Sequence, residues 1–144
     1  MLALKPQTLG FVCFCLVGCA PPAPEPILGV RLGMTPTQVR DRFDPAGPGT
    51  FRSEAMDEDF ALVWEPEADS AVRGARHEFH LGQLVAMRLT VSEDAPEASG
   101  AAILTTDLSV LTRESVAEGV AITWLARSCP THADEVRRRI RDHQ

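Results

Sequence analysis

Apolar residues that alternate with other residues along short segments are the feature that most constrains the fold. The alternation is clearest between Phe60 and Trp64 and between Val85 and Val91. A period of two places every second side chain on one face of an extended chain, which is typical of a half-buried β-strand. Further segments of this kind lie at 77–81, 108–113 and 120–126. Because polar breaks separate the segments, the pattern favours an antiparallel sheet.

The connection between the segments 77–81 and 85–91 sets the register of a predicted hairpin. A three-residue loop at 82–84 places Leu81 opposite Val85 and Phe79 opposite Met87, which gives one continuous apolar face. A two-residue turn at 82–83 instead pairs Phe79 with Ala86 and puts the two apolar faces out of step. We therefore predict the three-residue loop.

A helix is predicted to begin at Thr35. Thr35 is a favourable N-cap, Pro36 fits the first helical position, and Gln38 completes a capping box. Val39 and Phe43 then repeat at helical spacing and form an apolar stripe. The prolines and glycines that follow Phe43 end the helix.

A second helix is predicted near the C-terminus, with Thr131 as its cap and with Val136 and Ile140 on its apolar face. A short helix is also expected at 101–106. Strands in sequence with helices at both ends predict an α+β fold. We expect a small antiparallel sheet of five to six strands, with an N-terminal and a C-terminal helix packed on one face.

Residues 1–18 have the pattern of a signal peptide. Lys5 precedes an apolar run at 9–17, which is shorter than the roughly 20 residues that a membrane-spanning helix needs. The run ends in Leu16-Val17-Gly18-Cys19, which resembles the lipobox of bacterial lipoproteins. The resemblance implies that Cys19 receives a thioether-linked diacylglycerol and an amide-linked acyl chain such as palmitate. A plain secretory signal with an incidental Cys19 is the alternative.

The neighbouring residues favour Cys19 as the acylated position. Cys13 and Cys15 follow bulky residues, whereas the cleavage site of a lipoprotein signal requires a small one. Residues 20–26 contain four prolines, which favour an extended spacer. The predicted organisation is a signal peptide at 1–18, the acylated cysteine and tether at 19–27, and a single domain at 28–144. The resemblance further implies sorting to the outer membrane, facing the periplasm, because Ala20 follows the cysteine.

The charge of the chain excludes some partners. Lys5 is the only lysine, so residues 19–144 carry 13 arginines and 20 carboxylates, a net charge of −7. An acidic domain is a poor ligand for nucleic acid, which is bound through its phosphates. Anionic headgroups repel such a domain as well, so its attachment to a membrane depends on the lipid at Cys19.

Cys129 and His132 are the strongest candidates for chemistry in the domain. Their C-x-x-H spacing offers two metal ligands, but a closed zinc site needs two more. His77 and His80 point to opposite faces of a strand and cannot chelate together. A catalytic thiolate needs an adjacent base, and His132 follows Cys129 too closely to serve without special local geometry. We therefore predict no metal, no cofactor and no catalytic residue.

Three further features have simple structural interpretations. The acidic run 57–59 is interpreted as a solvated loop rather than a cation site, and Trp64 and Trp124 as core residues rather than an exposed patch. The arginines at 137–141 are interpreted as a solvated helix end that favours the helix dipole, although they could also meet an acidic partner.

The segment Gly33-Met34-Thr35-Pro36-Thr37-Gln38-Val39 introduces a second resemblance. Together with Phe43, Trp64 and a Phe79-x-x-Gly82 hairpin, it resembles the small lipoproteins of the SmpA/OmlA type, which include the BamE subunit of the outer-membrane β-barrel assembly machine. The resemblance covers roughly residues 28–91. Asp44-Pro-Ala-Gly-Pro48 replaces the usual Gly-x-Pro after the helix, and residues 100–144 have no counterpart.

The predicted function is that of a non-enzymatic, membrane-anchored envelope lipoprotein that binds or helps to assemble another envelope protein. A thiol-dependent envelope enzyme that uses Cys129 and His132 is one alternative. A small-ligand-binding or inhibitor module is the other.

Overall fold

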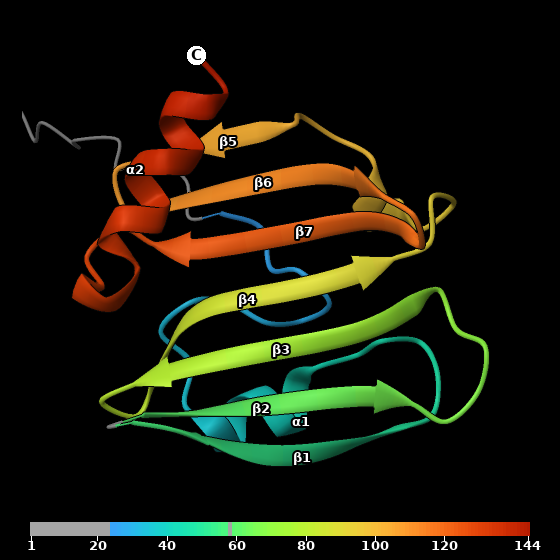
Figure 1. The fold of residues 1–144 in the computed structure, drawn as a ribbon. Coiled ribbons are helices and arrows are strands. Elements are labelled where there is room, and N and C mark those ends of the chain that lie inside the picture. The colour runs from blue at the N-terminus through green and yellow to red at the C-terminus, as the bar shows by residue number, and fades with distance from the viewer. Residues whose placement is uncertain (1–23, 58) are drawn as a thin grey trace, which may run out of the picture.

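Seven strands form one antiparallel sheet in the computed structural model, which describes residues 24–57 and 59–144. Their order is β1-β2-β3-β4-β7-β6-β5, because β7 pairs with β4 and the last three strands follow in reverse order (Figure 1). The strands are β1 (Gly49–Met56), β2 (Asp59–Pro66), β3 (Val72–His80), β4 (Gln83–Val91), β5 (Ile103–Thr105), β6 (Ser109–Val116) and β7 (Gly119–Ala126). The described helices are α1 (Pro36–Arg42) and α2 (Ala133–Asp142), with 3₁₀ turns η1 (Pro96–Ala98) and η2 (Pro130–His132).

The prediction of five to six strands is wrong, because the sheet has seven. β1 is an edge strand that carries Arg52 and Glu54, so it lacks a continuous apolar face and its period-two signal is weak. The short helix predicted at 101–106 is also wrong. The segment Ile103–Thr105 forms β5 instead, because its pairing with β6 determines its conformation.

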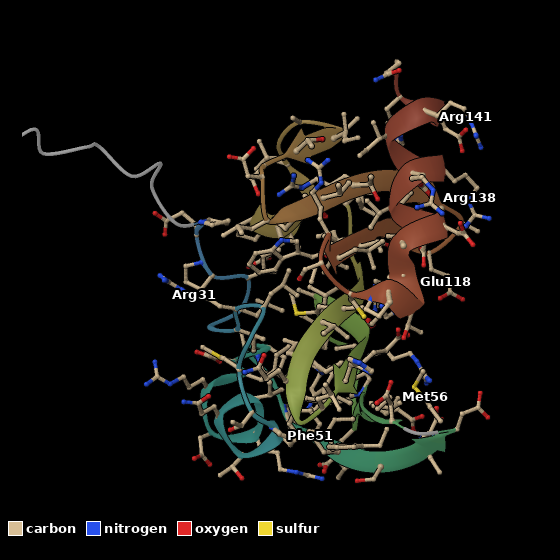
Figure 2. All side chains as sticks on the ribbon, turned by 90° about the vertical axis from the view of Figure 1, so that its left-hand side faces the viewer. Arg31, Phe51, Met56, Glu118, Arg138 and Arg141 are labelled. Carbon is tan, nitrogen blue, oxygen red and sulfur yellow. The ribbon has the colours of Figure 1, made fainter. Side chains whose placement is uncertain are left out.

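A helix covers part of each face of the sheet. The rear face in Figure 1 carries the main core, with Trp64 and Trp124 each 3% exposed, and α1 and the segment 24–34 pack on it. The front face carries a smaller cluster that contains Ala86 of β4 and Val136 of α2. The expected packing of an N-terminal and a C-terminal helix on one face is therefore wrong. Figure 2 shows α2 and the segment that contains Arg31 on opposite sides of the sheet.

The central strands explain why both faces need cover. In β4, Met87 belongs to the rear core and Ala86 to the front cluster. In β7, Trp124 and Leu125 divide in the same way. A strand that is apolar on both faces must be covered on both, as in sheets with helices on each side.

The turn between β3 and β4 is shorter than predicted. His80 pairs with Gln83, so only Leu81 and Gly82 form the turn. Both have positive φ, 51° for Leu81 and 75° for Gly82, as in the type I′ turn that suits a two-residue hairpin. The predicted pairing of Leu81 with Val85 is therefore wrong.

A β-bulge explains how this short turn still buries one apolar face. Phe79 pairs with Leu84, whereas the residue before it pairs with Ala86, so Val85 is an extra residue in β4. The predicted pairing of Phe79 with Met87 is wrong for this reason. The extra residue restores the alignment of the apolar faces that a two-residue turn alone would have broken.

The two helices begin in different ways. The Thr35 hydroxyl accepts a hydrogen bond from the Gln38 N–H, and the Gln38 side chain accepts one from the Thr35 N–H. α1 is only seven residues long, and Phe43 at its C-cap packs into the rear core. Thr131 lies inside η2 and does not cap α2, so that prediction is wrong. Pro130 starts the tighter turn before α2 begins.

Candidate functional site

A cysteine, a histidine and a glutamate meet at the amino-terminal end of α2. The Nδ1 atom of His132 lies 3.4 Å from the Cys129 sulfur, and its Nε2 atom lies 2.7 Å from Oε2 of Glu78. All three residues are buried, and the cysteine is 3% exposed. A nucleophile, a base and a carboxylate that orients the base are the parts of a catalytic triad.

The 3₁₀ turn η2 brings Cys129 and His132 together. Cys129 is the N-cap of this turn and His132 is its last residue. A 3₁₀ helix has three residues per turn, so side chains at i and i+3 lie one above the other. His132 can serve Cys129 only with special local geometry, and this turn provides it.

Arginines from two strands hold Glu78 in its charged form. Nε of Arg76 and Nε of Arg88 each donate to Oε1 of Glu78, both at 3.1 Å. Burial alone would raise the pKa of Glu78, but the hydrogen bond with His132 and the charge of Arg88 outweigh it and lower the pKa to about 2. Glu78 is therefore a carboxylate at neutral pH.

The charge of Glu78 acts through His132 on the cysteine. The hydrogen bond to Glu78 raises the pKa of His132 against the opposing effect of burial. Burial alone would raise the pKa of the Cys129 thiol, but the His132 ring and hydrogen bonds from Thr131 outweigh it, so the pKa is lowered. Both shifts favour a thiolate beside an imidazolium.

Glu78 is one member of a longer row of alternating charges on the front face, which we call the charge ladder. Its members are Glu65, Arg52, Glu54, Arg76, Glu78, Arg88, Glu135, Arg139 and Glu114, joined in that order by ion pairs. Arg88 binds Glu135 through two parallel hydrogen bonds of 2.9 and 2.8 Å. Ion pairs that are exposed to solvent contribute little to the free energy of unfolding. The half-buried pair of Arg88 and Glu135 therefore does most to fix the position of α2 on the sheet.

Glu135 links the charge ladder to α2. The hydrogen bond from Arg88 is the largest cause that lowers its pKa, which falls to about 2 although burial opposes the shift. Glu135 also accepts from Nε of Arg139 at 3.0 Å. Arg139 is therefore turned toward the sheet, unlike the exposed Arg138 and Arg141, which Figure 2 shows on the outer side of α2.

A second candidate site lies on the rear face, where two cavities flank Pro24. Their volumes are about 350 Å³ and about 430 Å³, and Pro24, Ser109 and Trp124 line both. Leu104 lines the first cavity and Leu108 the second, and these leucines are 51% and 74% exposed. We call this surface the apolar groove.

The groove lies beside β5, which forms one edge of the sheet. The opposite edge, β1, carries Arg52 and Glu54, and charged side chains discourage pairing with a further strand. The residues Ile103–Thr105 of β5 include no charge and no proline. Of the two edges, β5 is therefore the less protected, although it is short.

The hydrogen bonds of β5 show which of its backbone groups point outward. The Arg113 N–H donates to the Ala102 carbonyl, and the Thr106 N–H donates to the Ser109 carbonyl. Because such bonds alternate along an antiparallel pair, the backbone groups of Ile103 and Thr105 point away from β6. No strand of the described residues pairs with this side of β5, so the edge can accept a further strand.

The remaining candidate residues from the sequence analysis lie in separate parts of the structure. Cys19 lies outside the described residues. The structure does not bring His77 and His80 together, because His77 packs in the rear core beside Phe43 and His80 pairs with Asp59 at 2.9 Å. The prediction that both tryptophans belong to the core is confirmed.

Sequence reasoning missed Glu78. One signal was available, because Arg76, Glu78 and Arg88 place charge at period two on strands whose other face is apolar. That pattern indicates a charged front face but not its contact with His132.

Among the described residues, no group of three His, Cys, Asp or Glu side chains could hold a metal ion. No helix in the described part of the chain is long and apolar enough to cross a membrane. Comparison with known protein families, characterised proteins and solved structures gives no match. The resemblance to lipoproteins of the SmpA/OmlA type stays a prediction.

Proposed function

We propose that this chain is a non-enzymatic lipoprotein of the bacterial cell envelope, anchored through lipid at Cys19, whose domain binds another envelope protein. The bound part of the partner is an extended segment that pairs with β5. The observation that carries this proposal is the open backbone edge of β5 beside the apolar groove.

The arrangement of the sequence supports the anchor. The lipobox-like residues 16–19 precede a proline-rich spacer, and the described core begins at Ile27. The lipid thus holds the domain near the bilayer, and the outer membrane facing the periplasm is the proposed location.

The proposed mode of binding follows from two features of the β5 edge, its outward backbone groups and the apolar groove beside it. An incoming strand gains main-chain hydrogen bonds from Ile103 and Thr105, and its alternate side chains enter neighbouring pockets. Leu104, Leu108 and Trp124 make the adjacent groove apolar, so it accepts apolar side chains. The net charge of the chain is −6, which favours a segment with neutral or basic flanks.

Binding is proposed rather than catalysis because the groove lies beside the open edge of β5, whereas the Cys129 thiol itself lines none of five cavities found in the described residues. The nearest of these cavities is lined by Thr131 and Glu135, which neighbour the thiol site, but not by Cys129. A catalytic thiol is expected to face the cavity that holds its substrate, and Cys129 is buried instead.

The proposal predicts that Thr105→Pro abolishes partner binding. Proline removes the outward N–H of Thr105 without removing a hydrogen bond to β6, and edge strands tolerate it. Tagged full-length chain is crosslinked in envelopes, solubilised and captured, and its partners are quantified by mass spectrometry. We expect recovery of a specific partner to fall at least about tenfold, the scale of a loss of roughly 1.4 kcal/mol.

Thr105→Ser is the matched control, because it keeps the N–H and changes only the side chain. Circular dichroism and thermal unfolding establish that both variants fold. Equal recovery with Thr105→Pro and Thr105→Ser, or the absence of any reproducible partner, contradicts the proposed function.

A further inference from the structure

Cys129 combines a buried position with neighbours that favour its reactive form. Buried thiols in apolar surroundings are inert, because burial disfavours the thiolate. Here the sulfur lies 3.4 Å from a ring nitrogen of His132, and the polar groups of His132 and Thr131 lower the pKa of the thiol. The site therefore stabilises a negative charge on sulfur despite its burial.

The Glu78 carboxylate determines how the protons of the His132 ring are arranged. Glu78 accepts from Nε2 of His132, so this proton stays on the outer nitrogen and the proton on Nδ1 faces the sulfur. Arg76 and Arg88 keep Glu78 from moving away. Three separate elements, β3, β4 and η2, thus supply the groups around one thiol.

We propose that Cys129 is a site of oxidation by small hydroperoxides, with His132 and Glu78 as its positioning residues. This chemistry is independent of the binding proposed for β5. The reagent must be small, because Cys129 is 3% exposed. Hydrogen peroxide is the simplest member of the class.

The reaction is a two-electron oxidation of sulfur. The Cys129 thiolate attacks one peroxide oxygen, so that a sulfur–oxygen bond forms while the oxygen–oxygen bond breaks. The departing hydroxide takes the Nδ1 proton of His132 and leaves as water. Cys129 becomes a sulfenic acid, and the peroxide is reduced. Cys129 is the only cysteine among the described residues, so none of them offers a second thiol to form a disulfide with it.

The first experiment compares folded with unfolded protein. Full-length chain is treated with hydrogen peroxide at pH 7 in the presence of dimedone, which traps sulfenic acid. Mass spectrometry then measures labelling of the tryptic peptide 128–137, which separates Cys129 from the other cysteines. We expect Cys129 to react at least about tenfold faster in the folded chain than in urea, because its neighbours lower the thiol pKa and so raise the fraction of thiolate. Equal or slower labelling in the folded chain overturns the proposal, because simple burial predicts that result.

The second experiment tests the positioning residues. Glu78→Gln keeps the size of the side chain but removes the charge that holds His132 protonated, and His132→Gln removes the base. Glu114→Gln is the matched control, since Glu114 belongs to the charge ladder but contacts Arg139 rather than His132.

The readout is the pH at which the Cys129 labelling rate is half-maximal. We expect this midpoint to lie below the value of about 8.5 for a free thiol, to rise in Glu78→Gln and His132→Gln, and to stay constant in Glu114→Gln. Variants are scored only where circular dichroism shows the native fold. A folded Glu78→Gln chain whose midpoint equals that of the unmodified protein also overturns the proposal.

Discussion

Two buried histidines respond to their surroundings in opposite ways. His132 has a carboxylate at 2.7 Å, and this hydrogen bond raises its pKa. His77 is fully buried beside Phe43 and Phe51, and neither of its ring nitrogens has a hydrogen-bond partner. Burial lowers the pKa of His77 to about 4, and a weak contact with the backbone of Leu62 opposes the shift only in part. The same side chain thus favours charge in one place and neutrality in the other.

The low pKa of His77 predicts that acid destabilises the protein. Above pH 6.5 the histidine is neutral in both the folded and the unfolded chain, so its contribution to stability is fully present. Between pH 6.5 and about 4 the unfolded chain binds the extra proton, so the free energy of unfolding falls as the pH falls. The total loss from this residue is about 3 kcal/mol, at about 1.4 kcal/mol per pKa unit.

Urea denaturation at pH 7, 5.5 and 4 measures this effect. His77→Leu removes the titrating group and keeps an apolar side chain in the core, so its loss of stability on acidification should be smaller by about the same 3 kcal/mol. A His77→Leu chain with the same pH dependence as the unmodified protein contradicts the assignment. Other titrating groups cancel in this comparison.

At the scale of elements, a two-residue turn and a bulge act together to set the β3–β4 register. The turn places Leu81 at a φ of 51°, and that side chain is 87% exposed. A leucine is unfavourable there, because the left-handed region crowds its Cβ and no packing offsets the strain. The extra Val85 then realigns the strands so that Phe79 still enters the core.

This turn predicts that Leu81→Asn stabilises the protein. Asn-Gly is the preferred pair for a type I′ turn, since asparagine tolerates positive φ. We expect the free energy of unfolding to rise by about 0.5–1 kcal/mol, as measured by chemical denaturation. Leu81→Val serves as the control and should destabilise, because a β-branched residue fits positive φ worst. Stabilisation by both variants would point to lost surface hydrophobicity rather than to turn geometry.

Across the molecule, the two faces and the two edges of the sheet differ in structure and in proposed role. The rear face holds the main core and the apolar groove, and the front face holds the charge ladder and α2. β1 is protected by charge, whereas β5 leaves backbone groups open beside the groove. Pro24 lines that groove, so the segment that leads from the proposed anchor reaches the domain next to its proposed binding edge.

The proposed anchor predicts that Cys19→Ala releases the protein from the membrane. Two or more acyl chains hold a protein stably at a bilayer, and the acidic domain has no electrostatic attachment of its own. We expect the unmodified chain in the membrane fraction with acyl chains detectable by mass spectrometry, and Cys19→Ala outside that fraction. Cys15→Ala is the control and should remain acylated. Acylation that persists in Cys19→Ala, or an unmodified chain free of lipid, contradicts the assignment.

The strands could be predicted from sequence where burial imposes alternation. Phe60–Trp64 and Val85–Val91 lie within β2 and β4, and both tryptophans are in the core. The sequence did not predict β1 and β5, because an edge strand needs less apolar alternation than a central one. In addition, β5 is only three residues long. Only part of the thiol site could be predicted from the sequence. Cys129 and His132 are close together in the chain, whereas Glu78 is 54 residues away from His132.

Features that depend on neighbouring residues could be predicted from the sequence: the strand-forming segments and the cap at Thr35, with the lipobox-like pattern at 16–19 as a local prediction of the same kind. These features arise from periodicity or from contacts within four residues, so local order suffices to specify them. The folded arrangement was needed to show that the helices lie on opposite faces, that β5 is an edge strand of the described sheet, and that Glu78 meets His132 across 54 residues of chain. Such contacts depend on how strands pair and which faces are covered, and no local pattern encodes that choice.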